Sequence, residues 1–469
     1  MTERLRPQAP PRLRGARVLV VGAMRSGLSL TRFLLDQGAD VTLTDQKAAS
    51  GLPPAIDELR VRGARLELGG HDEATFTAAD LIAVSPGVPL ASPPLQAARG
   101  RGVRIVAEVE VASWFLTGTL VGITGSNGKS TTTALCGHVL HHAGLRAIAC
   151  GNLGTPLTEM VPDDAPDRIY VVELSSFQLE GIETFRPRVA ALLNLSPDHQ
   201  DRYPDVRAYY DAKARIFMNQ GPSDDAVLNH DDAEALAAGR RGAARRHAFS
   251  RTQEVDDGAF VRRGDIVVRR DGRETGVMPA AQAPLFGPHN LDNILATLLV
   301  ADLVGVPMSA AARGVATFRG LPHRLEKVSD RQGVAWFNDS KATNVGAAIQ
   351  SLLSFPGGVV LILGGKDKGG DFASMRPIIR SRVAHLILMG QARESIQGQL
   401  GPIAPTTMAA TMAEAVEAAA RLAAPGGVVL LAPACASFDQ YSSFEERGED
   451  FRRLVLALPA GSPPPREGR

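Results

Sequence analysis

The sequence predicts an α/β protein of three domains built on mostly parallel sheets. Short apolar runs typical of buried strands alternate with helix-like patterns along almost the whole chain. Glycine-rich or polar turns follow many of these runs, as is typical of the carboxyl ends of parallel strands. At 469 residues, the chain has room for about three domains. We expect a Rossmann-like domain over residues 1–108, a central domain over 109–320 and a second Rossmann-like domain over 321–469.

The first domain has the layout of a nucleotide-binding fold. Its expected strands are Arg17 to Val21, Val41 to Thr44 closed by Asp45, and Leu81 to Ser85 followed by Pro86. The first strand leads into the turn Gly22-Ala23-Met24-Arg25-Ser26-Gly27. Met24 stands where the dinucleotide fingerprint requires a glycine, so the turn does not favour a dinucleotide. The alternative is a glycine turn that serves packing alone.

The central domain contains a phosphate-loop pattern between a strand, Leu120 to Ile123, and a helix. Its residues are Gly125-Ser126-Asn127-Gly128-Lys129-Ser130-Thr131. Glycines allow the backbone to curl around phosphate oxygens, and the helix start adds the positive end of its dipole. Lys129 can reach the terminal phosphates, and the Ser130 hydroxyl can bind Mg²⁺. A strict motif would have glycine at Ile123, and the alternative is a chance Gly-Lys-Ser sequence. The pattern predicts a P-loop ATPase-like domain that binds a nucleoside triphosphate.

Further patterns complete this domain. The strand Arg168 to Glu173 ends in a carboxylate, which is well placed for Mg²⁺ beside a phosphate loop, although it could also be a solvated strand end. Ala190 to Leu195 is expected to be a strand and 251–282 a β-rich excursion, and a helix is expected to open at 287–293.

The third domain repeats the alternating pattern. Its expected strands are Ala335 to Asn338, Val359 to Leu363, Leu386 to Met389 and Val428 to Ala432, with a helix at Met412 to Ala423. Three polar clusters follow the strands, at 338–344, 364–369 and 433–439. Ligands bind at such ends in open α/β sheets, whereas the alternative is simple loop capping.

Composition excludes several classes of protein. Lys and Arg number 51 against 50 Asp and Glu, so no net field favours nucleic acid or an anionic membrane. No run approaches ~18 apolar residues, and residues 1–15 lack the apolar core of a signal peptide. Cys136, Cys150 and Cys435 lack metal or disulfide spacing and are expected to be core residues in a reducing compartment. We expect a cytoplasmic, monomeric enzyme with a solvated basic stretch at 240–246 and a disordered tail at 459–469.

Taken together, five motifs resemble the Mur ligases, ATP-dependent amide-forming enzymes of peptidoglycan synthesis. They are 125–131, Glu173 to Gln178, Asp198-His199, Tyr210-Asp211-Ala212-Lys213 and His289-Asn290-Leu291-Asp292-Asn293. The resemblance covers about residues 17 to 457. Within the family, 338–344, 432–441 and 444–448 are similar to members that add D-glutamate to UDP-N-acetylmuramoyl-L-alanine. Lys366 departs from the neutral or acidic residue expected before Asp367-Lys368.

The resemblance implies roles in catalysis. Lys129 would neutralise the γ-phosphate of ATP, and Ser130 and Glu173 would bind one Mg²⁺. A second Mg²⁺ would lie near His199 and a CO₂-derived carbamate on Lys213. A carbamate requires a neutral amine, so Lys213 would lie in a pocket that lowers its pKa. From the sequence alone, Lys213 would be interpreted as a solvated helix lysine.

The resemblance also implies ligand contacts. The UDP-sugar would meet Arg25 and Ser26 at the diphosphate, Asp45, Ser85 and Pro86 near uridine, and Asn152, Ser175 and His199 at the muramoyl-alanine end. Asn293, Arg324 and Asp339 would hold ATP. Thr343, Lys368, Ser437 and the Phe444 amide would bind D-glutamate, with Lys341 beside them. A folate-type polyglutamate ligase, a nicotinamide dehydrogenase and a nonenzymatic nucleotide-binding regulator are the alternatives, and each leaves some of these motifs unexplained.

Overall fold

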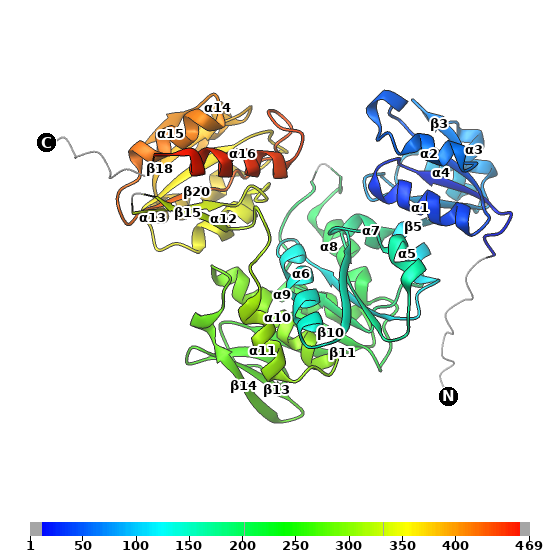
Figure 1. Ribbon diagram of the computed structural model, residues 1–469, viewed down its shortest axis with the longest axis horizontal. Helices are drawn as coiled ribbons and strands as arrows, with labels where there is room; N and C mark the ends of the chain where they lie inside the picture. The colour runs from blue at the N-terminus through cyan, green and yellow to red at the C-terminus, as the bar shows by residue number, and fades with distance from the viewer. Residues whose placement is uncertain (1–11, 201, 332, 460–469) are drawn as a thin grey trace, which may run out of the picture. The chain divides into compact units, whose positions relative to one another are not determined.

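The computed structural model describes residues 12–200, 202–331 and 333–459, which contain three sheets of five, nine and six strands (Figure 1). Each of the three expected domain ranges contains one sheet. Among the described residues, most of the first two ranges form one compact unit, and a second unit consists of 196–200, 283–291 and the described part of 319–459. The boundaries near 108 and 320 stay predictions. In the described residues no helix is long and apolar enough to cross a membrane.

The first sheet is parallel throughout, in the order β3-β2-β1-β4-β5. Its strands are β1 (Arg17–Val21), β2 (Asp40–Asp45), β3 (Arg65–Leu68), β4 (Leu81–Val84) and β5 (Arg104–Ala107). The helices are α1 (Arg25–Asp36), α2 (Ile56–Val61), α3 (Glu73–Ala78), α4 (Pro93–Gly100) and α5 (Glu108–Ser113). The central strand β1 is almost wholly buried because its residues pack against both layers. This is the Rossmann-like order that the sequence predicts.

The second sheet is parallel from β7 to β12 and ends in antiparallel strands. Its strands are β6 (Thr119–Thr124), β7 (Arg146–Gly151), β8 (Arg168–Glu173), β9 (Val189–Leu192), β10 (Asp225–Asn229), β11 (Arg245–Ser250), β12 (Gly258–Arg262), β13 (Asp265–Arg270) and β14 (Arg273–Pro279). The helices are α6 (Lys129–His142), α7 (Ser176–Glu180), α8 (Val206–Ala214), α9 (Ala233–Ala238), α10 (Pro288–Leu303) and α11 (Met308–Thr317). The β-rich excursion expected at 251–282 thus extends the parallel sheet. β9 ends at Leu192, short of the predicted Leu195, because the chain turns there toward the loop after β6.

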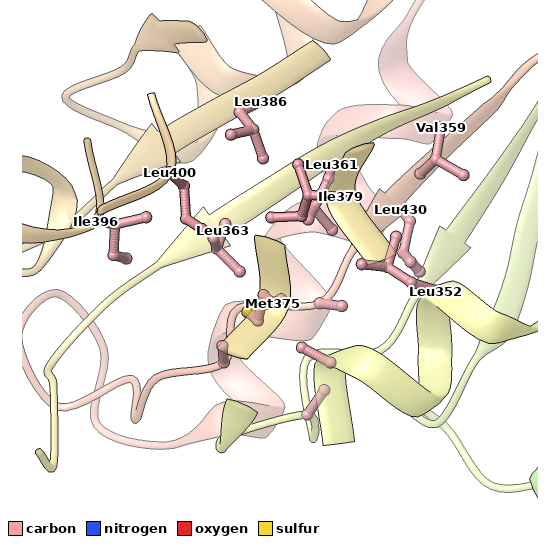
Figure 2. Close-up of a cluster of buried hydrophobic side chains, with 14 of the residues drawn as sticks. Leu352, Val359, Leu361, Leu363, Met375, Ile379, Leu386, Ile396, Leu400 and Leu430 are labelled. Atoms are coloured by element: carbon pink, nitrogen blue, oxygen red, sulfur yellow. The ribbon is translucent and has the colours of Figure 1, made fainter. Parts of the chain in front are cut away.

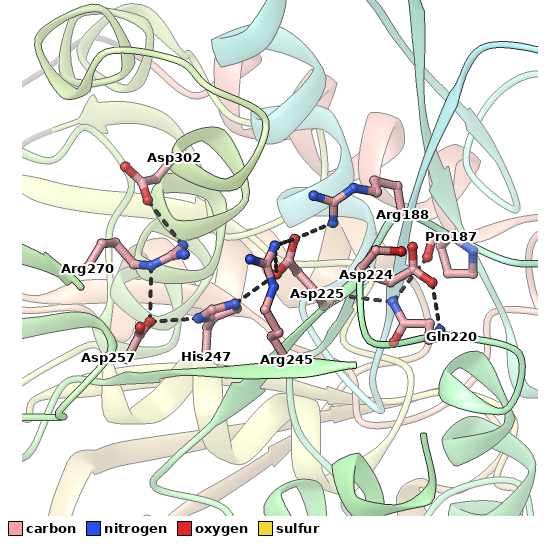
Figure 3. Close-up of polar contacts among 12 residues, drawn as sticks. Pro187, Arg188, Gln220, Asp224, Asp225, Arg245, His247, Asp257, Arg270 and Asp302 are labelled. Carbon is pink, nitrogen blue, oxygen red and sulfur yellow. Dashed lines mark hydrogen bonds and ion pairs between the residues drawn. The ribbon is translucent and has the colours of Figure 1, made fainter. Parts of the chain in front are cut away.

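A chain of charged groups joins this extension to the parallel strands (Figure 3). Buried His247 lies between two carboxylates, 2.9 Å from Asp225 and 2.6 Å from Asp257. Arg270 continues the chain, at 3.1 Å from Asp257 and 3.2 Å from Asp302. Arg245 lies 2.9 Å from the buried Asp225, so this member of the basic stretch is an ion-pair partner and not simply solvated.

The third sheet has the order β15-β16-β20-β17-β18-β19, with only β15 antiparallel to its neighbour. Its strands are β15 (Glu326–Arg331), β16 (Val334–Asn338), β17 (Val359–Gly364), β18 (Val383–Met389), β19 (Thr406–Met408) and β20 (Val428–Leu431). The helices are α12 (Val345–Leu353), α13 (Arg376–Arg382), α14 (Arg393–Leu400), α15 (Met412–Leu422) and α16 (Phe444–Ala457).

One core of this domain lies between β17 and the helices beside it (Figure 2). Leu361, Leu363 and Leu386 contribute apolar side chains from the sheet, and Leu352 and Ile396 from the helices. The continuous apolar run of β17 agrees with a strand that is buried on both faces.

Cys136, Cys150 and Cys435 are buried and are not in disulfides, as expected. Burial raises the pKa of the Cys136 and Cys435 thiols to about 12, so neither is a thiolate at neutral pH. The predicted disordered tail falls almost entirely outside the described residues, as does most of the segment 1–15.

Candidate nucleotide and substrate site

The loop after β6 has the backbone geometry of a phosphate loop. Gly125 and Gly128 have φ of 156° and 85°, in the region that favours glycine. A Cβ on Gly128 would lie 2.4 Å from Oδ1 of Asn293, so this position also requires the close approach that only glycine allows. Oδ1 of Asn293 accepts a hydrogen bond from Thr132 at 3.0 Å. The structure thus brings Asn293, from α10, beside the start of α6, and its contact with ATP stays a prediction.

Asn194, which the sequence analysis did not assign to the site, holds this loop in place. Its Oδ1 accepts the Asn127 N–H at 2.9 Å, and its Nδ2 donates to the Asn127 carbonyl at 3.1 Å. The carbonyl of Asn194 accepts the Ser126 N–H at 2.9 Å. The amides of Ser126 and Asn127 are therefore bonded within the protein. The amides of the first turn of α6, from Lys129 to Thr131, have no acceptors within the helix, so they are the donors suited to a phosphate.

Two lysines converge on one carbonyl of the loop. Lys129 Nζ donates to Gly125 O at 2.8 Å and to Ser126 O at 2.9 Å. Lys213 Nζ, from α8, donates to the same Gly125 O at 2.8 Å. Lys213 is 1% exposed and lies over the ring of Tyr209, so it is not the solvated helix lysine of the alternative interpretation. The structure thus brings both lysine side chains to the loop where a triphosphate would lie.

Glu173 ends β8 with a buried carboxylate, 2% exposed. Its Oε1 accepts from Asn152 Nδ2 at 2.8 Å, whereas Oε2 is buried without a hydrogen-bond partner among the described residues. Such an oxygen suits a hard cation. Ser130 lies in the first turn of α6, the helix that follows β6, and β6 is the strand paired with β8. The donor set therefore fits Mg²⁺. The described residues contain no cluster of three or more His, Cys, Asp or Glu side chains suited to a metal.

Two other residues predicted to lie at the muramoyl-alanine end of the substrate are Ser175 and His199. Ser175 caps α7 and accepts from the Gln178 N–H at 3.2 Å, so its contact with substrate stays a prediction. His199 has a φ of 53° and belongs to the second compact unit. Within that unit its neighbour Asp198 accepts from Asn344 at 2.9 Å. A role for His199 beside Lys213 stays a prediction.

In the first domain, predicted uridine residues shape the glycine turn. Asp45 accepts the Ala23 N–H at 2.7 Å and the Lys47 N–H at 2.8 Å, and Ser85 Oγ donates to the Gly22 carbonyl at 3.0 Å. Arg25 and Ser26 lie in the first turn of α1, and Arg25 is exposed.

Arg202 supports the loop after β4. Its guanidinium donates to the carbonyls of Pro86, Gly87 and Val88 at 3.4, 3.3 and 2.9 Å. No local sequence pattern indicates this contact, since the partners lie more than a hundred residues away.

The third domain places its predicted ligand residues at the carboxyl ends of the strands. Asp339 follows β16, accepts from Ser351, and has its pKa raised to about 6 by burial. The Lys341 ammonium lies 3.9 Å from the centre of the Phe444 ring. Ser437, after β20, is buried, whereas Lys368 is exposed. The charge of the nearby Arg324 lowers the pKa of Asp339, but this effect is smaller than the rise that burial causes. Thr343 lies in the same loop as Asp339, one residue before the cap of α12.

Comparison with known proteins agrees with this architecture. The family model described as Mur ligase MurD-like, N-terminal domain matches residues 16–107, the Mur ligase middle domain matches 123–301, and the Mur ligase, glutamate ligase domain matches 323–435. A protein of Geotalea uraniireducens (strain Rf4) named UDP-N-acetylmuramoylalanine--D-glutamate ligase is 47% identical over 95% of this chain and 98% of its own. One of the same name from Anaeromyxobacter dehalogenans (strain 2CP-C) is 48% identical over 95% and 99%.

Solved structures support the fold. A pseudomurein peptide ligase type C from Methanothermus fervidus has a TM-score of 0.60 at 18% identity, covering 95% of this chain and all of its own. The MurF ligase from Thermotoga maritima in complex with ADP has a TM-score of 0.58 at 17% identity, covering 89% and 95%. At these identities the likeness concerns the fold of the chain alone.

Proposed function

Because the chain belongs to the Mur ligase family, we propose that it is the ATP-dependent ligase that joins D-glutamate to UDP-N-acetylmuramoyl-L-alanine in peptidoglycan precursor synthesis. The observation that carries the proposal is identity of 45–48% with several D-glutamate ligases over nearly their whole length. The phosphate loop, with Lys129 and Lys213 on one carbonyl, supplies the chemistry that such a reaction requires.

The reaction begins with a poor electrophile. The carboxylate of the UDP-substrate must first take the γ-phosphoryl group of ATP, which gives an acyl phosphate and ADP. The amine of D-glutamate then attacks the acyl carbon, and phosphate leaves from the tetrahedral intermediate. Since anions approach one another in both steps, catalysis consists largely of positioning and charge neutralisation.

The described residues divide this work. The first-turn amides of α6 are suited to the phosphate chain, with Gly125, Ser126, Asn127 and Gly128 shaping the loop and Thr131 closing the turn. Lys129 would move from the loop carbonyls to the γ-phosphate, because phosphate is the stronger acceptor. Ser130 and Glu173 would hold Mg²⁺, which when bound neutralises charge on the transferring phosphoryl group.

Lys213 is proposed to carry a carbamate, and with His199 to hold a second Mg²⁺. The position of Lys213 supports this proposal, because its buried Nζ lies beside the phosphate loop, 2.8 Å from the Gly125 carbonyl that Lys129 also contacts.

We assign the ligands to three domains, 1–108 for the UDP-substrate, 109–320 for ATP and 321–469 for D-glutamate. Asp45 and Ser85 would act on uridine through the turn that they hold, and Arg25 and Ser26 directly on the diphosphate. The other proposed contacts are Pro86, Asn152 and Ser175 for the UDP-substrate, Asn293, Arg324 and Asp339 for ATP, and Lys341, Thr343, Lys368, Ser437 and Phe444 for D-glutamate. We further propose a cytoplasmic monomer.

An omission experiment tests the proposal. Release of ADP by the purified protein is followed with ATP and Mg²⁺, with and without each of the two other substrates. ADP should appear in quantity only when both are present, and the product should carry one added glutamate by mass. Release that continues without the UDP-substrate would exclude this reaction.

A further inference from the structure

Arg447 is a buried cation with no acidic partner. It lies on α16, is 2% exposed, and forms no ion pair among the described residues. Its Nε donates to Ser340 Oγ at 3.0 Å, and its Nη2 donates to the carbonyls of Ser340 and Cys435 at 2.9 and 3.2 Å. Its Nη1 is buried and has no hydrogen-bond partner in the described parts of the chain. Every group that accepts a hydrogen bond from this guanidinium is neutral, and burying an arginine in this way has a free-energy cost.

The partners of Arg447 identify what the side chain organises. Ser340 follows β16, Cys435 follows β20, and Gly365 follows β17, where an added Cβ would lie 3.1 Å from Nη1. These are the three loops with polar clusters at the carboxyl ends of the strands. The Ser340 hydroxyl also donates to the Phe444 carbonyl at 2.8 Å, which ties the start of α16 to the same group. One side chain therefore fixes the backbones that carry Thr343, Ser437 and Phe444.

The charge of Arg447 is retained under working conditions. Burial lowers its pKa to about 10, which still leaves the guanidinium protonated near neutral pH. The groups that face it are Cys435, Asp439 and Tyr441, and a carboxylate oxygen of Asp439 already accepts from the Gln391 N–H at 2.8 Å. The positive end of the dipole of α16, whose N-cap is Ser443, lies at the same edge of the sheet. Arg447 and the start of α16 thus both contribute positive charge near these loops, with Asp439 as an acidic group that faces the guanidinium.

We propose that Arg447 is a positioning residue for the acceptor amino acid: its buried guanidinium bonds the loops after β16 and β20, lies beside Gly365 after β17, and supplies a positive charge without an ion-pair partner among the described residues, which favours a dicarboxylate. This inference rests on the proposed function. It predicts that Arg447 governs the KM for D-glutamate while having little influence on ATP or the UDP-substrate. The side chain acts from behind the binding loops, so it is distinct from residues that contact the acceptor.

The test measures KM for all three substrates, and kcat, in Arg447→Met, Arg447→Lys and Ser340→Ala. Methionine keeps an unbranched side chain but removes the charge and the donors, so the KM for D-glutamate should rise at least ~10-fold, whereas the other two KM values should stay within about 2-fold. Lysine keeps the charge and should recover part of the loss. Ser340→Ala keeps the guanidinium and should raise the KM for D-glutamate less than methionine does. Arg453→Met, at an exposed arginine of the same helix that pairs with Asp450, should match the unmodified protein.

Two results would overturn the inference. One is an unchanged KM for D-glutamate in folded Arg447→Met. The other is a uniform change in all three KM values, which a merely structural role would give. If Arg447→Met does not fold, Arg447→Lys and Ser340→Ala decide by the same pattern. If the unmodified protein does not use D-glutamate at all, the proposed function fails, and that result is distinguishable because it needs no variant.

Discussion

Replacing Asn194 by alanine should weaken ATP use by a predictable amount. The change removes two hydrogen bonds to the main chain of Asn127, at 2.9 and 3.1 Å, and leaves the main-chain bond from Ser126 to residue 194 in place. Each lost bond contributes about 0.5–1.5 kcal/mol net, so the loop should lose ~1–3 kcal/mol of its positioning. If that loss appears in the transition state, kcat/KM for ATP falls about 5- to 150-fold.

The assay is steady-state ADP release at varied ATP with the other substrates saturating. Asn194→Asp keeps the acceptor for the Asn127 N–H but turns an oxygen toward the Asn127 carbonyl, so its loss should equal or exceed that of alanine. Asn219→Ala is a matched control, because Asn219 also donates to two backbone carbonyls, those of Glu183 and Phe185, away from the phosphate loop. It should lower stability and leave kcat/KM for ATP unchanged. Equal ATP kinetics in Asn194→Ala and the unmodified protein would show that Asn194 does not position the phosphate loop.

Three further predictions follow from other parts of the site. Lys129→Ala should abolish most turnover yet leave binding of the UDP-substrate intact by calorimetry, because its charge matters most as the phosphoryl group moves; near-normal turnover would exclude this loop. Lys213→Ala should be nearly inactive and partly restored by acetate or formate, which can replace carbamate oxygens, whereas rescue by amines instead would contradict carbamylation. Burial raises the pKa of Glu108 to about 7, so the carboxyl stays protonated to higher pH in the folded state than in the unfolded state. The free energy of unfolding is therefore highest below about pH 4 and falls as the pH rises toward 7. Glu108→Gln cannot lose this proton, so its free energy of unfolding by urea should rise relative to that of the unmodified protein by up to about 3 kcal/mol between pH 4 and 8. If the two free energies instead change in parallel with pH, Glu108 does not titrate in this way.

The sequence predicts the elements that are apolar along their whole length. β1, β8 and β17 consist mostly of buried apolar residues, chiefly valine, leucine and isoleucine, and each was predicted within a residue or two. The edge strand β15, Glu-Lys-Val-Ser-Asp-Arg, and the three-residue β19 were missed. They are polar or short because a strand with one open edge buries little apolar surface, so periodicity carries little signal there.

The same division applies to the site. The phosphate loop could be predicted because its chemistry lies in consecutive residues, 125–131. The roles of Asn194 and Arg447 could not be predicted, because their backbone partners are distant in the sequence. Asn194 bonds to Asn127, 67 residues away, and Arg447 bonds to Ser340, 107 residues away. Asp45 and Ser85 were predicted to lie near uridine, and that contact stays a prediction. That their side chains bond to the backbone of the glycine turn could not be predicted, because it depends on the register of β1, β2 and β4. The burial of Lys213 likewise depends on how α8 packs, which the lysine itself does not encode.

The central claim, that this chain adds D-glutamate to UDP-N-acetylmuramoyl-L-alanine, is tested most directly by ADP release with that substrate against a panel of amino acids. The panel contains D-glutamate, L-glutamate, L-alanine and meso-diaminopimelate at equal concentration. We expect that D-glutamate alone supports rapid release, because both carboxylates and the configuration at the α-carbon must fit the loops after β16, β17 and β20. Equal or faster release with L-alanine or meso-diaminopimelate would contradict it.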